Sequence, residues 1–226
     1  NAAEMTKKVN AVLHCNDWTG QTYSYSVYDY ASKILAEPES SEYKSSAPLI
    51  KAMLNYGGYV QTYFNEKTDA LANKGLYNKT NDPVLTTNTT VSKDYNYAVF
   101  NNNIGVSFIG GSLVLNSGTD LKLYYSINDQ NMANNINVSV NGQNVAPEYD
   151  GNIMCVRVPD ISISSLGDTY NVKVSVNGKE INQKYSAMTY MYKALNSQNS
   201  NTKLNNVVKA LYLYNEAAKQ YSMGIE

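Results

Sequence analysis

Apolar and polar residues alternate along much of the chain between about residues 83 and 184, the period-two pattern of strands with one buried face. The clearest segments are residues 121–125, 136–140 and 172–176. Asn141-Gly142 and Asn177-Gly178 follow two of these segments, and Asn-Gly favours the tight turn of a β-hairpin. About six to eight short strands within roughly a hundred residues predict an antiparallel β-sandwich of immunoglobulin-like size.

Helical spacing of apolar residues replaces this alternation on both sides of the strand region. A helix is predicted over residues 27–35, where Ser26 and Asp29 have the spacing of a capping box. A second helix is predicted from Pro48 to Phe64, because proline is tolerated in a first turn. Residues 187–195 and 204–221 predict a similar pair near the C-terminus.

The two helical pairs are related by an internal repeat. YSVYDY at residues 25–30 matches YSAMTY at 185–190, and KAMLNY at 51–56 matches KALYLY at 209–214. A repeat of this kind indicates a duplicated structural unit. We therefore predict that the two helical hairpins superpose.

Each helical pair also follows a predicted β-hairpin. Residues 9–15 and the turn at 16–20 lead into the first pair, as residues 172–184 lead into the second. The expected unit is a sandwich followed by two helices, with the first sandwich mostly missing. The predicted fold class is α+β, with domains at 1–80 and 81–226, the latter comprising a sandwich at about 83–184 and a helical hairpin at 185–226.

Three groups of glycines carry further predictions. Gly57-Gly58 lies within a predicted helix, where each glycine costs about 1 kcal/mol of helix stability relative to alanine. Close approach of a neighbouring backbone would offset this cost; a kinked helix is the alternative. A short helix is predicted over residues 68–73, with Gly75 ending it. Gly105 and Gly110-Gly111 are interpreted as bulges within strands.

The helical segments resemble a sequence found in a group of exported bacterial proteins. The run MLNYGGYVQTYF at residues 53–64, TDALAN at 68–73 and VKALYLYNEAA at 208–218 resemble a segment that recurs in large secreted and surface proteins of gut-associated Firmicutes. The resemblance implies an exported location. Those proteins mix adhesive, glycan-binding and enzymatic modules, so it transfers no activity and no site residue.

Charge and hydropathy restrict the partners. The chain has 18 basic and 19 acidic residues, a formal net charge of -1, so there is no excess of positive charge for nucleic acid or anionic lipid. No apolar run approaches the roughly 18 residues of a membrane span. Because the chain opens Asn1-Ala2-Ala3-Glu4 without an initiator Met or a signal sequence, we expect a processed fragment of a secreted or cell-surface protein.

The inventory of catalytic residues is small. His14 is the one histidine and lies in a predicted strand, and no serine stands in a Gly-x-Ser-x-Gly elbow. Cys15 and Cys155 lack metal-ligand spacing, so they are either bridged or two buried thiols. Glu148 and Asp150 have the residue type of a glycosidase pair, but a solvated turn is the favoured interpretation.

Acidic loops at 129–135 and 148–152 do not match the calcium-loop pattern, and turn chemistry is favoured there. We therefore expect no catalytic residues, no metal and no cofactor.

Recognition is the remaining class of function. The 21 tyrosines, against 3 Phe and 1 Trp, supply aromatic surface that tolerates water. Trp18, in the turn at residues 16–20, and Tyr149, in a predicted loop, are the candidate ligand-binding residues. We expect a non-enzymatic adhesion module that binds a host or extracellular protein; a glycan-binding module and a spacer without a ligand are the alternatives.

Overall fold

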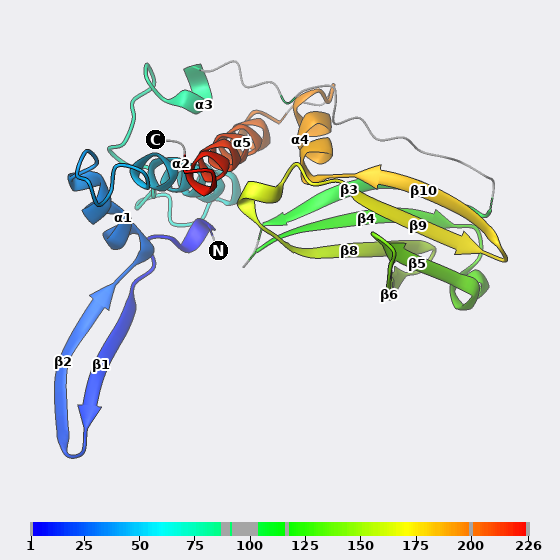
Figure 1. Ribbon diagram of the computed structural model, residues 1–226, viewed down its shortest axis with the longest axis horizontal. Coiled ribbons are helices and arrows are strands. Elements are labelled where there is room, and N and C mark those ends of the chain that lie inside the picture. The colour runs from blue at the N-terminus through cyan, green and yellow to red at the C-terminus, as the bar shows by residue number, and fades with distance from the viewer. Residues whose placement is uncertain (1, 87–90, 92–103, 116–117, 199–200, 225–226) are drawn as a thin grey trace. The chain divides into compact units, whose positions relative to one another are not determined.

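The computed structural model describes residues 2–86, 91, 104–115, 118–198 and 201–224. The chain divides into two compact units, Asn1–Thr89 with Ser200–Glu226, and Thr90–Asn199. Both helices and antiparallel sheets are present, as the predicted α+β class requires (Figure 1).

The first unit joins a β-hairpin to a group of helices. Its elements are η1 (Ala2–Glu4), β1 (Val9–Cys15), β2 (Trp18–Tyr25), α1 (Val27–Ala36), α2 (Ala47–Phe64), α3 (Pro83–Thr86) and α5 (Thr202–Ser222). Strands β1 and β2 form a two-stranded antiparallel sheet that extends away from α1 and α2 (Figure 1). The four longer helices of the chain, including α4 described below, form where helical spacing predicted them.

Two contacts fix α2 in this unit. Ala31 of α1, Leu54 of α2 and Ala72 form a buried apolar cluster. On α5, the ring of Tyr214 stacks on Tyr56 with centroids 5.8 Å apart. Tyr56 and Tyr214 are matched positions of the sequence repeat.

The paired glycines of α2 are buried at close approaches. A Cβ at Gly57 would lie 2.6 Å from Met5 Sδ and 3.1 Å from the carbonyl oxygen of Ala2. A Cβ at Gly58 would lie 2.0 Å from Oδ1 of Asn73. The predicted backbone approach is therefore present at Gly57, while a side chain occupies the space beside Gly58.

The short helix predicted over residues 68–73 is wrong, because this stretch consists of turns. The side chain of Gln61, fully buried, holds the turns in place. Its Nε2 donates to the carbonyl of Ala70 at 3.1 Å, and its Oε1 accepts from the amide of Ala72 at 2.7 Å. Backbone groups that a helix would bond internally are thus bonded to one side chain.

The second unit contains most of the strands. Its elements are β3 (Val106–Leu115), β4 (Thr119–Ile127), η3 (Gln130–Asn135), β5 (Ile136–Val140), β6 (Gln143–Val145), β7 (Glu148–Asp150), β8 (Ile153–Ile161), η4 (Ile163–Ser165), β9 (Tyr170–Val176), β10 (Lys179–Tyr185) and α4 (Ala187–Leu195). They form two four-stranded antiparallel sheets, in the orders β10-β9-β5-β6 and β3-β4-β8-β7.

Side chains of the two sheets meet in a common core. Tyr125 of β4 donates its hydroxyl to Oε1 of Gln183 on β10 at 3.0 Å, and the ring of Phe108 on β3 lies 5.7 Å from that of Tyr185 on β10. Gly111 leaves room for Tyr185, whose ring would lie 3.1 Å from an added Cβ. The two sheets therefore form two layers over one apolar interior (Figure 1).

The predicted turns of this unit are confirmed. Asn141-Gly142 joins β5 to β6 and Asn177-Gly178 joins β9 to β10, with all four residues at positive φ, as a type I′ turn requires. The β3–β4 register shifts between Phe108 and Gly110, which confirms a bulge there. The bulge predicted at Gly105 is wrong, because Gly105 lies at φ 80° before β3 begins at Val106.

The predicted strand region begins differently. Residues 83–86 form α3, and the first described strand after it is β3; residues 87–90 and 92–103, part of the predicted region, lie outside the described residues. The predicted boundary at residues 80 and 81 follows the sequence repeat, whereas the compact units follow proximity and place α4 in the second unit and α5 in the first.

The same hydrogen bonds occur where each β-hairpin joins its helix. Ser26 Oγ accepts from the amide of Asp29 at 3.0 Å, and Ser186 Oγ accepts from the amide of Thr189 at 3.0 Å, so both helices begin with a capping box. Two residues after each cap serine, the amide of Tyr28 donates to the carbonyl of Met5 at 2.9 Å, and the amide of Met188 donates to the carbonyl of Leu166 at 3.0 Å.

Candidate binding face on the N-terminal hairpin

One face of the β1–β2 hairpin collects most of the apolar side chains of the two strands; Val12, opposite Thr22, lies on the other face. Directly opposed residues share a face, and the register opposes Val9 to Tyr25, Ala11 to Tyr23 and Cys15 to Trp18. Leu13 has the same parity on β1. We call these seven side chains the hairpin face: Val9, Ala11, Leu13, Cys15, Trp18, Tyr23 and Tyr25.

A bulge in β2 places Trp18 on this face. Between the pairs Val12 to Thr22 and His14 to Thr19, β2 has one residue more than β1. The extra residue reverses the side-chain parity of β2, so Trp18 shares a face with Tyr23. Gly20 lies at the bulge, where an added Cβ would come within 2.6 Å of the indole of Trp18.

The hairpin face is open to solvent along its length. The exposed fractions are 69% for Val9, 64% for Leu13, 57% for Trp18 and 67% for Tyr23. Both faces of the hairpin are exposed, so no other part of its unit covers it. Isolated two-stranded hairpins are marginally stable in water, and large exposed apolar patches are frequent at interaction sites.

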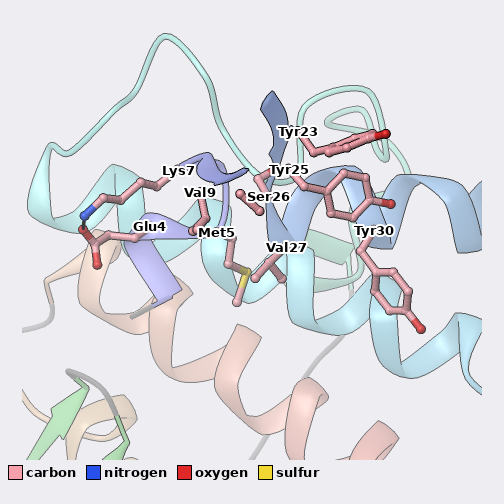
Figure 2. Close-up of a pocket in the computed structure, with 10 residues that line it drawn as sticks. Glu4, Met5, Lys7, Val9, Tyr23, Tyr25, Ser26, Val27 and Tyr30 are labelled. Carbon is pink, nitrogen blue, oxygen red and sulfur yellow. Dashed lines mark hydrogen bonds and ion pairs between the residues drawn. The ribbon is translucent and has the colours of Figure 1, made fainter. Parts of the chain in front are cut away.

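The base of the hairpin face continues into a groove of about 710 Å³ (Figure 2). Val9, Tyr23 and Tyr25 line it from the hairpin, and Val27 and Tyr30 line it from α1. The tyrosine rings gather at one end (Figure 2). Val27 and Tyr30 share the apolar spacing of α1 with the buried Ala31 and Ile34, but both are about half exposed because they face this groove.

The other end of the groove carries an ion pair (Figure 2). Lys7 Nζ lies 3.2 Å from Glu4 Oε1, and this hydrogen bond and charge lower the pKa of Glu4. The charges compensate each other, so the groove offers an apolar and aromatic surface without net charge.

Trp18 and Tyr149 lie in different compact units. Trp18 was predicted in a turn at residues 16–20, but the turn is formed by Asn16 and Asp17 and Trp18 begins β2 directly after it, with Asn16 at φ 51°. The loop predicted around Tyr149 is wrong: residues 148–150 form β7, a strand at the edge of its sheet. The hydroxyl of Tyr149 donates to the carbonyl of Ala133 at 3.4 Å.

The potentially reactive side chains named from the sequence are His14, Cys15 and Cys155. His14 Nδ1 lies 3.0 Å from Thr19 Oγ1 across the exposed hairpin. Both cysteines are free; Cys155 is buried, which raises the pKa of its thiol, but the expectation of two buried thiols is wrong for Cys15, which is exposed. The exposure of Cys15 follows from its place on the uncovered hairpin face.

Of the acidic residues in the predicted loops, Glu148 and Asp150 lie in β7 and not in a turn, and Asp129 lies at the start of η3. Glu148 lies 3.9 Å from Lys122 Nζ, and Asp129 caps η3 by accepting from the amide of Asn131 at 2.9 Å. Across the described ranges, no three His, Cys, Asp or Glu side chains gather as metal ligands.

Sequence reasoning found part of the hairpin face. It identified Trp18 and the alternation of residues 9–15, but not Tyr23, Tyr25 and their shared face with Trp18. The alternation of Tyr23 and Tyr25 was a readable signal. The parity change at Gly20 was not, because a bulge depends on the pairing of the two strands.

Comparisons of the chain with models of protein families, with curated proteins and with solved structures find no match. Within the residues that the structure describes, no helix has both the length and the apolar character of a bilayer span.

Proposed function

We propose that this chain is a non-enzymatic protein-binding module of a secreted or cell-surface bacterial protein, and that the hairpin face is its contact surface. The observation that carries the proposal is the exposure of seven apolar and aromatic side chains on one side of a two-stranded sheet. The partner is a host or other extracellular protein with an apolar contact surface.

The composition of the hairpin face supports a protein partner. None of its seven side chains is charged, and it carries one Trp and two Tyr, the residue types that dominate binding energy at protein interfaces. The polar residues lie around it, with the Lys7–Glu4 pair at the groove and Lys8 Nζ 3.8 Å from Asp29 Oδ2. An apolar centre with a polar rim is the usual anatomy of an interface.

The finer description of the fold belongs to the same proposal. We take the two-layered second unit to be an immunoglobulin-like β-sandwich and the helical pairs to be a duplication. The support is the sheet order, the size of the unit, the sequence repeat and the matched capping boxes at Ser26 and Ser186. The resemblance to exported Firmicutes proteins supports the exported location only.

A glycan is the second candidate ligand. The groove brings the rings of Tyr23, Tyr25 and Tyr30 together at one end, and aromatic faces are suited to stacking on sugars (Figure 2). The first candidate is preferred because the hairpin face extends beyond the groove and is apolar along its length.

The two candidates are separated by one parallel experiment. The chain is presented to a glycan array and, immobilised, to mucosal secretions, together with Tyr23→Ser and the control Thr22→Ser from the opposite face of β2. We expect a protein that is captured by the wild type and Thr22→Ser but not by Tyr23→Ser. Glycan binding that Tyr23→Ser abolishes, without such a protein, would replace the first candidate with the second.

A further inference from the structure

The hairpin face has a counterpart within the same chain. Val9 opposes Tyr25, and Tyr170 opposes Tyr185 in the same way. Tyr25 and Tyr185 end their strands, and each directly precedes the serine that caps a helix. Counting along the strands from these pairs aligns β1 with β9 and β2 with β10. The residues Val9, Ala11, Leu13 and Cys15 correspond to Tyr170, Val172, Val174 and Val176, and Tyr23 and Tyr25 to Gln183 and Tyr185.

The correspondence begins before the first strand. The 3-10 helices η1 and η4 precede β1 and β9 by the same number of residues. The amide of Lys7 donates to Glu4 at 2.8 Å, and the amide of Asp168 donates to Ser165 at 3.0 Å. Together with the matched bonds of Tyr28 and Met188 at the helix starts, these contacts show one local design in two places.

The two copies differ in burial. Val174 and Tyr185 are 0% and 1% exposed, whereas their counterparts Leu13 and Tyr25 are 64% and 49% exposed. What covers the buried copy is the sheet β3-β4-β8-β7, through Tyr125 and Phe108, whose contacts with β10 are given above. The chain itself thus shows which kind of structure covers a hairpin of this design.

We infer that the hairpin face is the closing hairpin of a further two-layered unit, and that its occupant is a four-stranded antiparallel sheet equivalent to β3-β4-β8-β7 from a unit of the same kind. This inference rests on the proposed function, because it names the partner of the proposed contact surface. Two observations argue for this occupant beyond the correspondence itself.

The first observation is size, since β1 and β2 have seven and eight residues and β9 and β10 have seven each, giving nearly the same footprint. The second is charge. The buried core residues Leu121, Leu123, Tyr125, Met154 and Val156 of the covering sheet are uncharged, as are the side chains of the hairpin face. The buried Asp120 has the opposite parity to Leu121, Leu123 and Tyr125 on β4 and is paired with Arg157.

A second copy of this chain does not supply the occupant in its folded form. Its own sheet β3-β4-β8-β7 already packs against β10 through Tyr125 and Phe108. The occupant therefore comes from a unit whose sheet lacks a closing hairpin of its own. The β1–β2 hairpin provides what such a unit needs.

The test places an additional copy of residues 104–162 before Ala2 of the full chain. Ser162 of the copy then directly precedes η1, as Ser162 of the native chain directly precedes η4. Trp18, the one tryptophan of the native chain, reports on the hairpin face through iodide quenching of its fluorescence. We expect quenching to fall at least about threefold and the β1–β2 amides to exchange at least about tenfold more slowly than in the native chain. A fusion with Val156→Asp in the added copy alone should keep the native values.

Three outcomes overturn the inference. The first is an added sheet whose amides are protected from exchange, while the quenching of Trp18 and the amide exchange of β1–β2 keep the values of the native chain. The second is dimerisation of the native chain through the hairpin face, in which case the wild type is a dimer and Tyr23→Ser is a monomer. If the added copy does not fold, a second variant is used, in which a copy of residues 2–25 replaces residues 163–185 of the full chain. We expect the second unit of this variant to stay folded. Unfolding of that unit is the third outcome.

These outcomes are distinguishable from failure of the proposed function. If the fusion leaves the hairpin face open while a captured protein still binds the wild type and not Tyr23→Ser, the partner is not a sheet of this kind and the protein-binding function stands. If the fusion covers the face but no separate protein is captured, the face closes a neighbouring unit and the adhesive role fails.

Discussion

Asp120 is a buried carboxylate on β4 whose ionised form is stabilised by specific partners. Burial favours the neutral form, but Oδ1 accepts from the amide of Asp160 at 2.9 Å and Oδ2 accepts from Arg157 Nε at 2.9 Å. These bonds outweigh burial and lower the pKa of Asp120. A carboxyl with a lowered pKa in the folded state contributes stability above its unfolded pKa of about 4 and loses it as pH falls through the folded value.

Asp120→Asn therefore tests this carboxylate. We expect the free energy of unfolding of the second unit to fall by about 1–3 kcal/mol at pH 7, because the charge-assisted bonds are weakened. The difference between variant and wild type should shrink as pH falls from about 4 through the lowered pKa of folded Asp120, since below that pKa both proteins carry a neutral group. Urea titrations at several pH values measure this; a difference independent of pH would contradict the assignment.

Gly58 gives a second prediction at this scale, because helix propensity and packing oppose each other. Replacing a helical Gly by Ala stabilises by about 1 kcal/mol when space allows. At Gly58 the added Cβ would displace Asn73, whose Nδ2 donates to Asn55 Oδ1 at 2.9 Å. Gly58→Ala should destabilise the first unit by about 1–3 kcal/mol. Thermal unfolding beside Ala52→Gly, which isolates the propensity, checks the sign; a stabilised Gly58→Ala would contradict the packing.

Among elements, those with local signals were predictable. The helix starts at Ser26 and Ser186 and the Asn-Gly turns follow from side-chain chemistry within a few residues, and both appear as expected. The turns at residues 68–73 were not predictable, because their backbone bonds to the side chain of Gln61, nine and eleven residues before Ala70 and Ala72. The bulge that turns Trp18 onto the hairpin face depends likewise on pairing between strands.

The two hairpins predict a difference in amide exchange within one molecule. In the chain alone, β1–β2 is open on both faces, while the equivalent positions of β9–β10 are buried. Amides of β1–β2 should exchange at least about tenfold faster, since opening uncovers little apolar surface. Hydrogen exchange followed by mass spectrometry reads both hairpins in one sample. Equal protection would mean that the hairpin face is already covered.

For the whole molecule, the sequence predicted the α+β composition but not which helices share a unit. The repeat places residues 185–226 together, while α5 lies in the first unit, where its apolar side packs on α2. A repeat records the order of segments along the chain, and the pairing of α2 with α5 depends on contacts far apart in sequence.

Leu211→Ala tests this assignment of α5. Leu211 is 1% exposed, so truncation should destabilise the first unit by about 2–5 kcal/mol and leave exchange in β4 and β8 unchanged. Met191→Ala, at a buried position of α4, is the matched control and should affect the second unit instead. Loss of protection in β4 and β8 on Leu211→Ala would contradict the assignment.

The most direct test of the hairpin face as a protein-binding surface is the affinity of Trp18→Ala for a protein captured by the wild type. Because Trp18 is 57% exposed, the change should cost only about 1 kcal/mol of folding stability, and Thr22→Ala on the opposite face controls for disturbance of the hairpin. We predict that Trp18→Ala raises the dissociation constant at least about fivefold, as an interface anchor does, while Thr22→Ala leaves it unchanged. Unaltered binding by a folded Trp18→Ala would contradict the account.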